Sequence, residues 1–123
     1  MPGSLVHFEL PAKDGDRAQT FWSGVFGWSF SDAGMPGIDY RMVRTGENQG
    51  GAVYTSDDGG RGAIIYFDSD DIEASLAKVR ELGGEAEDKS PIPGVGWFAR
   101  CKDTEGNEFS LFQSDESVSM PSQ

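Results

Sequence analysis

The sequence predicts an α+β domain in which the same order of strands and a helix occurs twice. Residues 5–10 alternate apolar with polar side chains, as a half-buried strand does, and residues 63–67 form a short apolar run. A helical pattern and further short strands follow each run, and a polar, glycine-rich stretch at 56–62 separates the halves. At 123 residues the chain fits one domain. Neither half could cover its own sheet, so we expect the two to pack side by side.

In the first half, a helix is expected from Asp14 or Asp16, either of which can cap it, to about Phe26, with Gly27 as a left-handed stop. Apolar residues recur along it at helical spacing and are expected to pack on a sheet as core, together with Phe26 and Trp28: Ala18, Phe21, Trp22 and Val25. Short strands are predicted at 28–32, 40–44 and 52–55. The glycine pairs at 50–51 and 59–60 are predicted to form turns.

In the second half, Asp70 with Glu73 three positions later predicts a capping box. The helix after it is expected to end at Leu82 and the two glycines that follow. A β-hairpin closes the pattern, with strands at 95–101 and 108–113 around a polar turn at 103–107. Successive side chains of a strand point to opposite faces, so Phe109 and Leu111 are expected on one face, and Ser110 and Phe112 on the other.

Composition excludes several classes of partner. The net charge of −11 would repel nucleic acid and anionic membrane surfaces. No apolar run is long enough to span a bilayer and no signal peptide is recognisable, so we expect a cytoplasmic protein. Cys101 is the single cysteine, which rules out an internal disulfide and fits a reducing compartment. We expect it to be a packed thiol.

The candidate polar site is the pair His7 and Glu9, which alternation places on one face of the first strand. Three interpretations stay open: a hydrogen-bonded histidine without further role, a ligand contact, or acid–base chemistry with Glu9 orienting the imidazole. Four aromatic residues are candidate walls of a small-molecule site: Tyr54, Tyr66, Trp97 and Phe112.

Two stretches are distinctive, the FW…FGW helix exit and the DTEGNEFSLFQ hairpin. Together with DIEASLAKVRELGG they resemble the vicinal oxygen chelate superfamily, which includes glyoxalase I, bleomycin-resistance proteins, extradiol dioxygenases and fosfomycin-resistance enzymes. The resemblance covers nearly the whole chain. It implies a single domain over 1–123, with two βαβββ modules at about 4–56 and 62–114 that form a half-barrel cleft. It also implies a homodimer, and the polar tail at 115–123 is expected to be frayed.

Active members of this superfamily hold a divalent metal, and the resemblance places its ligands in this chain. His7 stands at the first ligand position. The other positions fall at Ile64, at Ser110, where active glyoxalases carry glutamate, and within 51–53, where no donor side chain is present. A catalytic zinc needs at least three protein ligands. We therefore predict no metal site and no cofactor, and the ligand count argues against glyoxalase I activity.

The predicted function is binding of a small organic molecule, uncharged or cationic, in an aromatic cleft, as in the bleomycin-resistance branch. The residues expected to contact it are His7, Glu9, Tyr54, Ile64, Tyr66, Trp97, Ser110 and Phe112. One alternative is a lyase, isomerase or dioxygenase-like enzyme that uses His7 and Glu9 or a metal completed by its substrate. The second alternative is a non-catalytic interaction module.

Overall fold

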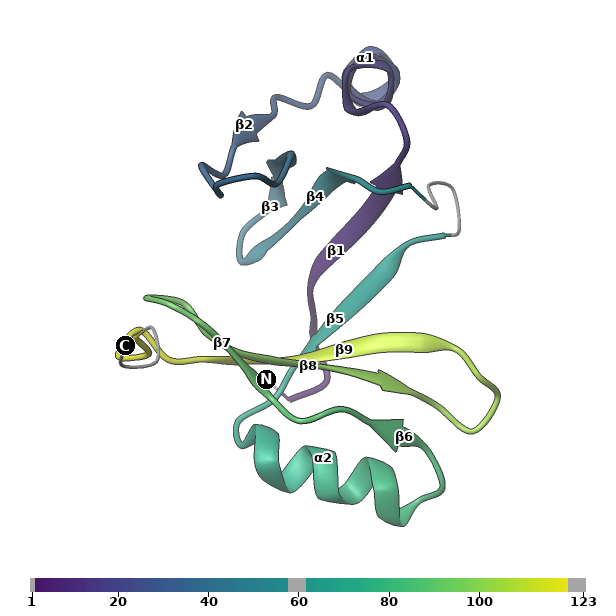
Figure 1. Cartoon of the computed structure of the whole chain (residues 1–123), viewed down its shortest axis with the longest axis vertical. Coiled ribbons are helices and arrows are strands. Elements are labelled where there is room, and N and C mark those ends of the chain that lie inside the picture. Colours follow the sequence, from purple (N-terminus) through teal and green to yellow (C-terminus); the bar gives the residue numbers. More distant parts are fainter. Residues whose placement is uncertain (1, 58–61, 120–123) are drawn as a thin grey trace. The chain divides into compact units, whose positions relative to one another are not determined.

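The computed structural model describes residues 2–57 and 62–119, which belong to two compact units. The first unit is Val6–Ile64, and the second combines Met1–Leu5 with Ile65–Gln123. Each contains strands and one helix in the predicted order, so the fold class is α+β (Figure 1). Neither helix of the described part is long and apolar enough to cross a membrane.

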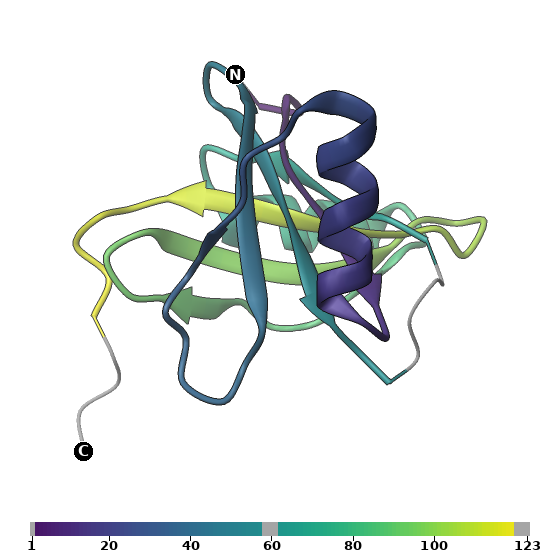
Figure 2. The same ribbon diagram turned by 90° about the horizontal axis from the view of Figure 1, so that it is seen from above.

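The first unit has the order strand, helix and three strands. Its elements are β1 (Leu5–Ala12), α1 (Gly15–Phe26), β2 (Ser31–Asp32), β3 (Tyr40–Gly46) and β4 (Gln49–Thr55). The strands lie in the order β2-β3-β4-β1, with β1 parallel and β3 antiparallel to β4. Helix α1 packs against one face of β4 (Figure 2).

Helix α1 begins and ends as the sequence predicts. The Asp14 carboxylate accepts a hydrogen bond from the Arg17 backbone N–H at 3.0 Å, which satisfies one of the unpaired amides of the first turn. Gly27 ends the helix in the left-handed region at φ 71°.

The prediction that the apolar side chains of α1 are core is wrong for two residues of the stripe and for the neighbouring Phe26. Phe21, Val25 and Phe26 are 59%, 54% and 58% exposed. The rings of Trp22 and Trp28 are half-buried and stack at 5.5 Å between centroids. Helical spacing identifies the apolar side of a helix, but it does not show how much of that side the sheet covers.

The pair Gly50 and Gly51 lies inside β4 and not in a turn, contrary to the prediction. A side chain at Gly51 would collide with the ring of Phe8 on the helix-covered face. At Gly50 a Cβ atom would lie 2.7 Å from the Val43 carbonyl oxygen of the neighbouring strand. The absence of a side chain at both positions therefore lets the Phe8 ring and the Val43 backbone lie close to β4. Such close approach is a known reason for glycine within a strand. The other predicted glycine turn, 59–60, lies outside the described residues.

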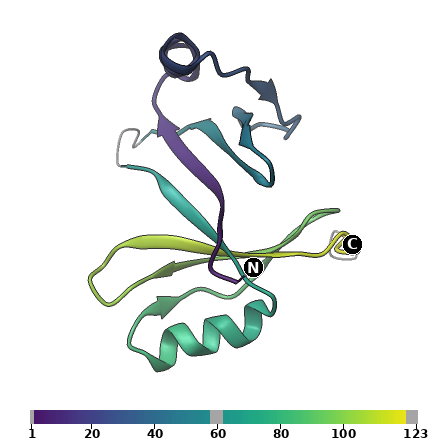
Figure 3. The same ribbon diagram turned by 180° about the vertical axis from the view of Figure 1, so that it is seen from behind.

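The second unit repeats the order with one strand broken in two. Its elements are β5 (Ile64–Asp68), α2 (Ile72–Glu81), β6 (Glu85–Ala86), β7 (Ser90–Ile92), β8 (Gly96–Lys102) and β9 (Glu108–Ser114). Strand β9 lies between β5, which is parallel to it, and β8, which is antiparallel. Both β6 and β7 pair with β8, and their registers differ by one residue, so together they form one interrupted edge strand (Figure 3).

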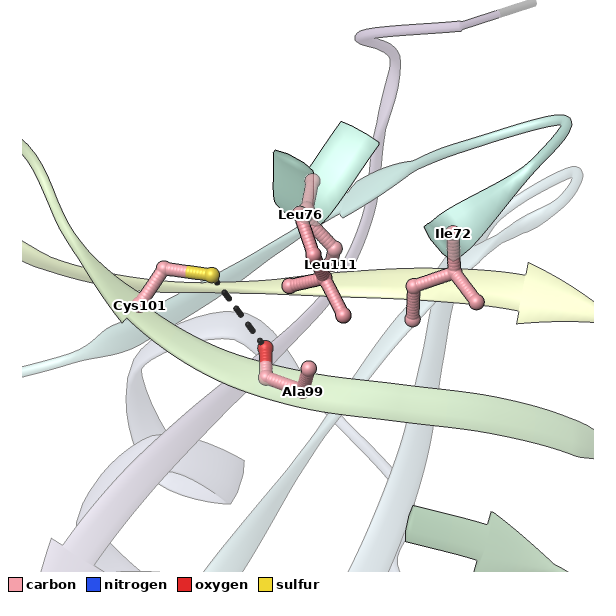
Figure 4. Packing of buried hydrophobic residues seen from close by; sticks show 5 residues of the cluster. All are labelled: Ile72, Leu76, Ala99, Cys101 and Leu111. Carbon is pink, nitrogen blue, oxygen red and sulfur yellow. Dashed lines mark hydrogen bonds between the residues drawn. The ribbon is translucent and has the colours of Figure 1, made fainter. Parts of the chain in front are cut away.

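The core of the second unit lies between α2 and the β8–β9 hairpin. Ile72 and Leu76 of α2 are fully buried against Ala99, Cys101 and Leu111 (Figure 4). Burial raises the pKa of the Cys101 thiol to about 11, so it is a packed thiol as predicted.

The cap of α2 lies one residue later than the sequence suggests. Asp71, not Asp70, accepts the capping hydrogen bond from the Ala74 backbone N–H at 3.2 Å. Several carboxylates stand side by side at 68–71, so sequence alone could not select the one at the cap.

The described part of the C-terminal tail, 115–119, is attached to the second unit, so the prediction of a frayed tail is wrong there. Val118 is buried, and its carbonyl oxygen accepts a hydrogen bond from the Gly94 N–H at 2.8 Å. Asp115 N–H donates to the Val95 carbonyl oxygen at 2.9 Å. Residues 120–123 lie outside the described part.

Candidate functional site

One face of the first unit's sheet points away from α1. Arg41 of β3 lies on the helix side, since its guanidinium binds Asp16 and Gln19 of α1. Neighbouring side chains of a strand alternate, so Tyr40 points to the opposite face. Register places Tyr54, which pairs with Tyr40, and Glu9, which pairs with Ala52, on that same face.

Three polar side chains on this face form a continuous hydrogen-bonded chain. The Tyr40 hydroxyl donates to Glu9 Oε2 at 2.7 Å, and the hydroxyl oxygen of Tyr40 also lies 2.8 Å from His7 Nε2. His7 and Glu9 are two residues apart on β1, so the tyrosine from β3 bridges them. Glu9 is 8% exposed, and a buried carboxylate needs such a donor.

Aromatic rings lie beside this polar chain. The rings of Tyr40 and Tyr54 stack with centroids 6.2 Å apart, and the His7 ring lies nearly parallel to that of Tyr40 at 6.4 Å. Opposite His7 and Glu9, strand β4 contributes the small residues Gly50 and Ala52. Flat rings and a few fixed polar atoms are typical of sites that bind small organic molecules.

Burial lowers the pKa of His7 below its ordinary value, while the negative charge of Glu9 opposes this with a smaller upward effect. The imidazole is therefore neutral at pH 7 and can accept a proton. A neutral histidine hydrogen-bonded to a fixed partner is a common form of general base.

A cavity of about 630 Å³ lies elsewhere in the first unit, around Arg41. Arg41 already donates to both carboxylate oxygens of Asp39, at 2.8 and 3.0 Å, to Asp16 at 2.9 Å and to Gln19 at 3.0 Å. The bonds from Arg41 to Asp16 and Gln19 hold α1 to β3. Because the carboxylates of Asp39 and Asp16 already neutralise the guanidinium, Arg41 is not available to bind an anionic ligand. We therefore place the candidate site at His7, Tyr40 and Glu9.

A second group of predicted residues lies on β5 and β9, on the sheet face opposite α2. Register places Tyr66 beside Ser110, and Phe98 beside Phe112. Ile64 and Tyr66 are buried, and alternation along β5 places them on one face. Ser110 is 0% exposed, and its Oγ has no hydrogen-bond partner among the described residues. An unsatisfied buried hydroxyl is costly unless a ligand or water completes it.

Trp97, predicted as a wall of the site, lies on the other face of this sheet. It packs against the α2 core cluster, and Lys89 Nζ lies 4.2 Å above its ring. On β8, Trp97 has the same parity as Ala99 and Cys101, whereas Phe98 has the parity that leads to the face of Ser110. Trp97 and Phe98 are neighbouring aromatic residues on opposite faces of β8, so the sequence pattern could not show which of them lies on the face of Ser110.

The metal that the family resemblance implies does not fit these residues. His7 and Glu9 are both bound to the Tyr40 hydroxyl, Ile64 has no donor atom, and Ser110 offers one buried hydroxyl. Within residues 2–57 and 62–119, no three His, Cys, Asp or Glu side chains come together as a metal site. Catalytic zinc sites need three protein ligands.

Tyr40 is the functional candidate that sequence reasoning missed. It begins the predicted strand 40–44, and alternation alone allows either face. Only the register of β3 against β4 and of β4 against β1 brings its hydroxyl between His7 and Glu9. A tyrosine at a strand start opposite another tyrosine is a weak signal without that register.

The family model of the glyoxalase-like domain matches residues 6–112. Among curated proteins, CFP32 of Mycobacterium bovis is 30% identical over 115 residues, which are 90% of this chain and 44% of CFP32. The chain thus spans less than half the length of that relative. A glyoxylase-like domain-containing protein of Didymella fabae is 30% identical over 118 residues, covering 89% of this chain and 92% of that protein.

Solved structures with this fold have lower sequence identity. A hypothetical protein from Bacillus halodurans has a TM-score of 0.73 at 15% identity, covering 93% of this chain and 96% of that one. Methylmalonyl-CoA epimerase from Mycobacterium tuberculosis has a TM-score of 0.70 at 15% identity, covering 92% and 88%. A glyoxalase/bleomycin resistance protein/dioxygenase superfamily member from Vibrio splendidus has 0.69 at 18%, covering 90% and 100%. The chain therefore belongs to the glyoxalase-like domain family, with the fold of the vicinal oxygen chelate superfamily.

Proposed function

We propose that this protein binds a small organic molecule on the face of the first unit that carries His7, Tyr40 and Glu9. The observation that carries the proposal is the partly buried hydrogen-bonded chain of these three residues beside the stacked rings of Tyr40 and Tyr54. The rings offer a flat apolar surface, and the polar atoms would orient the ligand. This face also lacks the helix that covers the other side of the sheet.

An uncharged or cationic ligand suits the site best. The chain carries a net charge of −11, which attracts cations and repels anions over the whole surface. Glu9 adds a negative charge at the site itself, and a stacked tyrosine pair is a favourable partner for a cation.

A separate polar contact, within the second unit alone, is also proposed. Ser110 Oγ is buried without a hydrogen-bond partner among the described residues, next to Tyr66 and on the same face as Phe112. A ligand atom that bonds this hydroxyl would remove the cost of its burial. The single cleft predicted from the sequence stays a prediction, as do the homodimer and the cytoplasmic location.

A thermal-shift screen of small organic molecules tests the proposal, followed by calorimetric titration of the compounds that stabilise the protein. The library includes aromatic amines, neutral aromatics and acyl-CoA thioesters, because structures of the Streptomyces coelicolor methylmalonyl-CoA epimerase hold 2-nitronate-propionyl-CoA. A ligand at about 100 times its Kd stabilises a protein by about 2.7 kcal/mol, which raises the Tm by several degrees. We expect amines or neutral aromatics to do so.

The variants locate the site. His7→Ala and Tyr54→Ala are expected to weaken binding by about tenfold or more, because each removes a hydrogen bond or a ring from the site. Trp97→Phe is the matched control on the helix-packed face and should bind as the wild type does. The proposal fails if no compound stabilises the protein, or if Trp97→Phe weakens binding while His7→Ala does not.

A further inference from the structure

One side of helix α1 carries apolar side chains that the sheet does not cover. Phe21 is 59%, Val25 54% and Phe26 58% exposed. The rings contact one another, since the ring centroid of Trp22 lies 5.1 Å from that of Phe21 and 5.9 Å from that of Phe26. Trp28 continues the cluster, with its ring centroid 5.0 Å from that of Phe26. We call these five residues the α1 apolar patch.

The α1 apolar patch is large enough to form the centre of an interface. From their exposed fractions, Phe21, Val25 and Phe26 together leave roughly 300 Å² of apolar surface open to solvent. Single exposed apolar residues are common, but contiguous patches of roughly 300–600 Å² are often functional. A standard interface buries about 800 Å² per partner, so the patch supplies the apolar centre of such an interface and not the whole of it.

The distribution of charge indicates which partner fits this surface. Residues 18–31 contain no Asp, Glu, Lys or Arg, although 25% of the chain is charged. A partner recognised through ion pairs would find no counterion here. Two copies of this chain each carry a net charge of −11 and repel one another, and the repulsion is weakest where both surfaces are uncharged. An apolar patch opposite an identical patch is self-complementary, as a two-fold interface requires.

The side chains of α1 also fit an antiparallel pair of helices. Arg17, Phe21 and Val25 follow one another at intervals of four residues, and such a row packs into the groove of a second helix. With a two-fold axis between Phe21 and Val25, Arg17 of one copy lies at the C-terminal end of the other copy's helix. That end has no basic residue in its last turn to complement the helix dipole. Arg17 is available for this contact, because its 4.0 Å ion pair with Asp14 is exposed to solvent and therefore weak.

We infer that the α1 apolar patch binds the same patch on a second copy of this chain and forms a weak two-fold dimer. The dimer is weak because the apolar area of the patch is less than half of what a standard interface buries on each partner. Helix α1 and the face of His7, Tyr40 and Glu9 lie on opposite sides of the first unit's sheet. The inference therefore does not depend on the proposed ligand site, and association and ligand binding are separable in experiments.

Sedimentation equilibrium of the full chain tests the inference. Between about 1 µM and about 1 mM protein, a range that brackets the affinity of a weak interface, the weight-average mass should rise from 13.3 kDa toward twice that value. Phe21→Asp should raise the dimer Kd by about tenfold or more, because it places two like charges in the apolar centre. Leu82→Asp is the matched control, since Leu82 is 68% exposed at the end of α2 and the substitution adds the same charge away from the patch. It should dimerise as the wild type does.

The variants also test the geometry of the dimer. Circular dichroism checks that Phe21→Asp folds, and Val25→Asp is the second variant, with the same expected loss of dimer. Arg17→Gln should raise the Kd by about twofold to tenfold, because two symmetrical contacts with a helix end are lost. A chain that stays monomeric at about 1 mM would overturn the inference, as would a dimer that both aspartate variants leave intact or that Leu82→Asp weakens equally. An unchanged Kd in Arg17→Gln would overturn the antiparallel arrangement.

Discussion

His7 connects the chemistry of the site with the stability of the fold. Its pKa is lowered in the folded protein, mainly by burial, relative to the ordinary value of 6.5. The folded state therefore binds a proton less readily than the unfolded chain does. By linkage, the stability that neutral His7 contributes is fully present above pH about 6.5 and is lost as the pH falls through the lower, folded pKa.

Replacing His7 by Gln should flatten part of this pH dependence. Gln preserves a hydrogen bond to Tyr40 but does not titrate. At pH 8 we expect the variant to be less stable than the wild type by about 0.5–1.5 kcal/mol, and the difference to shrink as the pH falls from 7 to 5. Urea unfolding at several pH values measures this. Parallel stability profiles for the two proteins would contradict it.

At the residue scale, sequence reasoning named two of the three residues of the hydrogen-bonded chain, His7 and Glu9, and missed Tyr40. The alternation of 5–10 placed His7 and Glu9 on one face of a strand, because a period of two needs no tertiary information. Tyr40 could not be found, since its position depends on the register of three strands. Trp97 was likewise misplaced, because the register of β8 puts its side chain on the α2 side of the sheet and not on the face of Ser110.

The two helices are attached to their sheets to very different degrees. Helix α2 buries Ile72 and Leu76 completely, whereas the buried residue of α1 is Gly15. α1 is held instead by its Asp14 cap and by the bonds from Arg41 to Asp16 and Gln19. Polar bonds at an exposed surface contribute less stability than buried apolar side chains do.

Hydrogen exchange should show this difference. Backbone amides of α1 are expected to exchange well before those of α2, because few buried contacts oppose its local opening. Arg41→Ala should speed exchange in α1 selectively, while Leu76→Ala should lower the global unfolding free energy by about 2–5 kcal/mol. Mass spectrometry after pepsin digestion resolves the two helices. Equal protection in both would contradict the prediction.

At the element scale, the type and order of the helices and strands were predictable, but how much of each helix the sheet covers was not. Both helices and the closing hairpin follow from caps, glycine stops and alternation, which are local signals. The Asp103 carboxylate, for example, accepts from the N–H groups of Glu105 and Asn107 in the predicted turn. The exposure of Phe21 and Val25 depends on which parts of the chain pack against that side of α1, and local sequence patterns do not predict such tertiary contacts.

For the whole molecule, the family match indicates a fold whose active members bind a metal, whereas the residues at the metal-ligand positions do not suit one. The glyoxalase-like model matches most of the chain, and similar solved structures include methylmalonyl-CoA epimerase. Yet the positions that the family resemblance assigns to metal ligands hold Ile64 and Ser110, and His7 and Glu9 are engaged with Tyr40. Membership fixes the fold, while the function depends on the side chains present.

The purified protein is therefore expected to behave identically with and without a chelator. EDTA should leave the Tm unchanged, since a metal that binds only the folded state would raise it by mass action. Elemental analysis should find well below one divalent ion per chain. One tightly bound ion per chain, or chelator-sensitive turnover of a hemithioacetal, would overturn the assignment against a metal-dependent glyoxalase.

The contact of Gly51 with the ring of Phe8 has an evolutionary consequence. Any side chain at position 51 would enter the space of that ring, so a substitution there requires a smaller residue at position 8. The two positions lie opposite each other on parallel strands β1 and β4. Across related sequences they should therefore change together, and a chain with alanine or valine at 51 is expected to have lost the phenyl ring at 8.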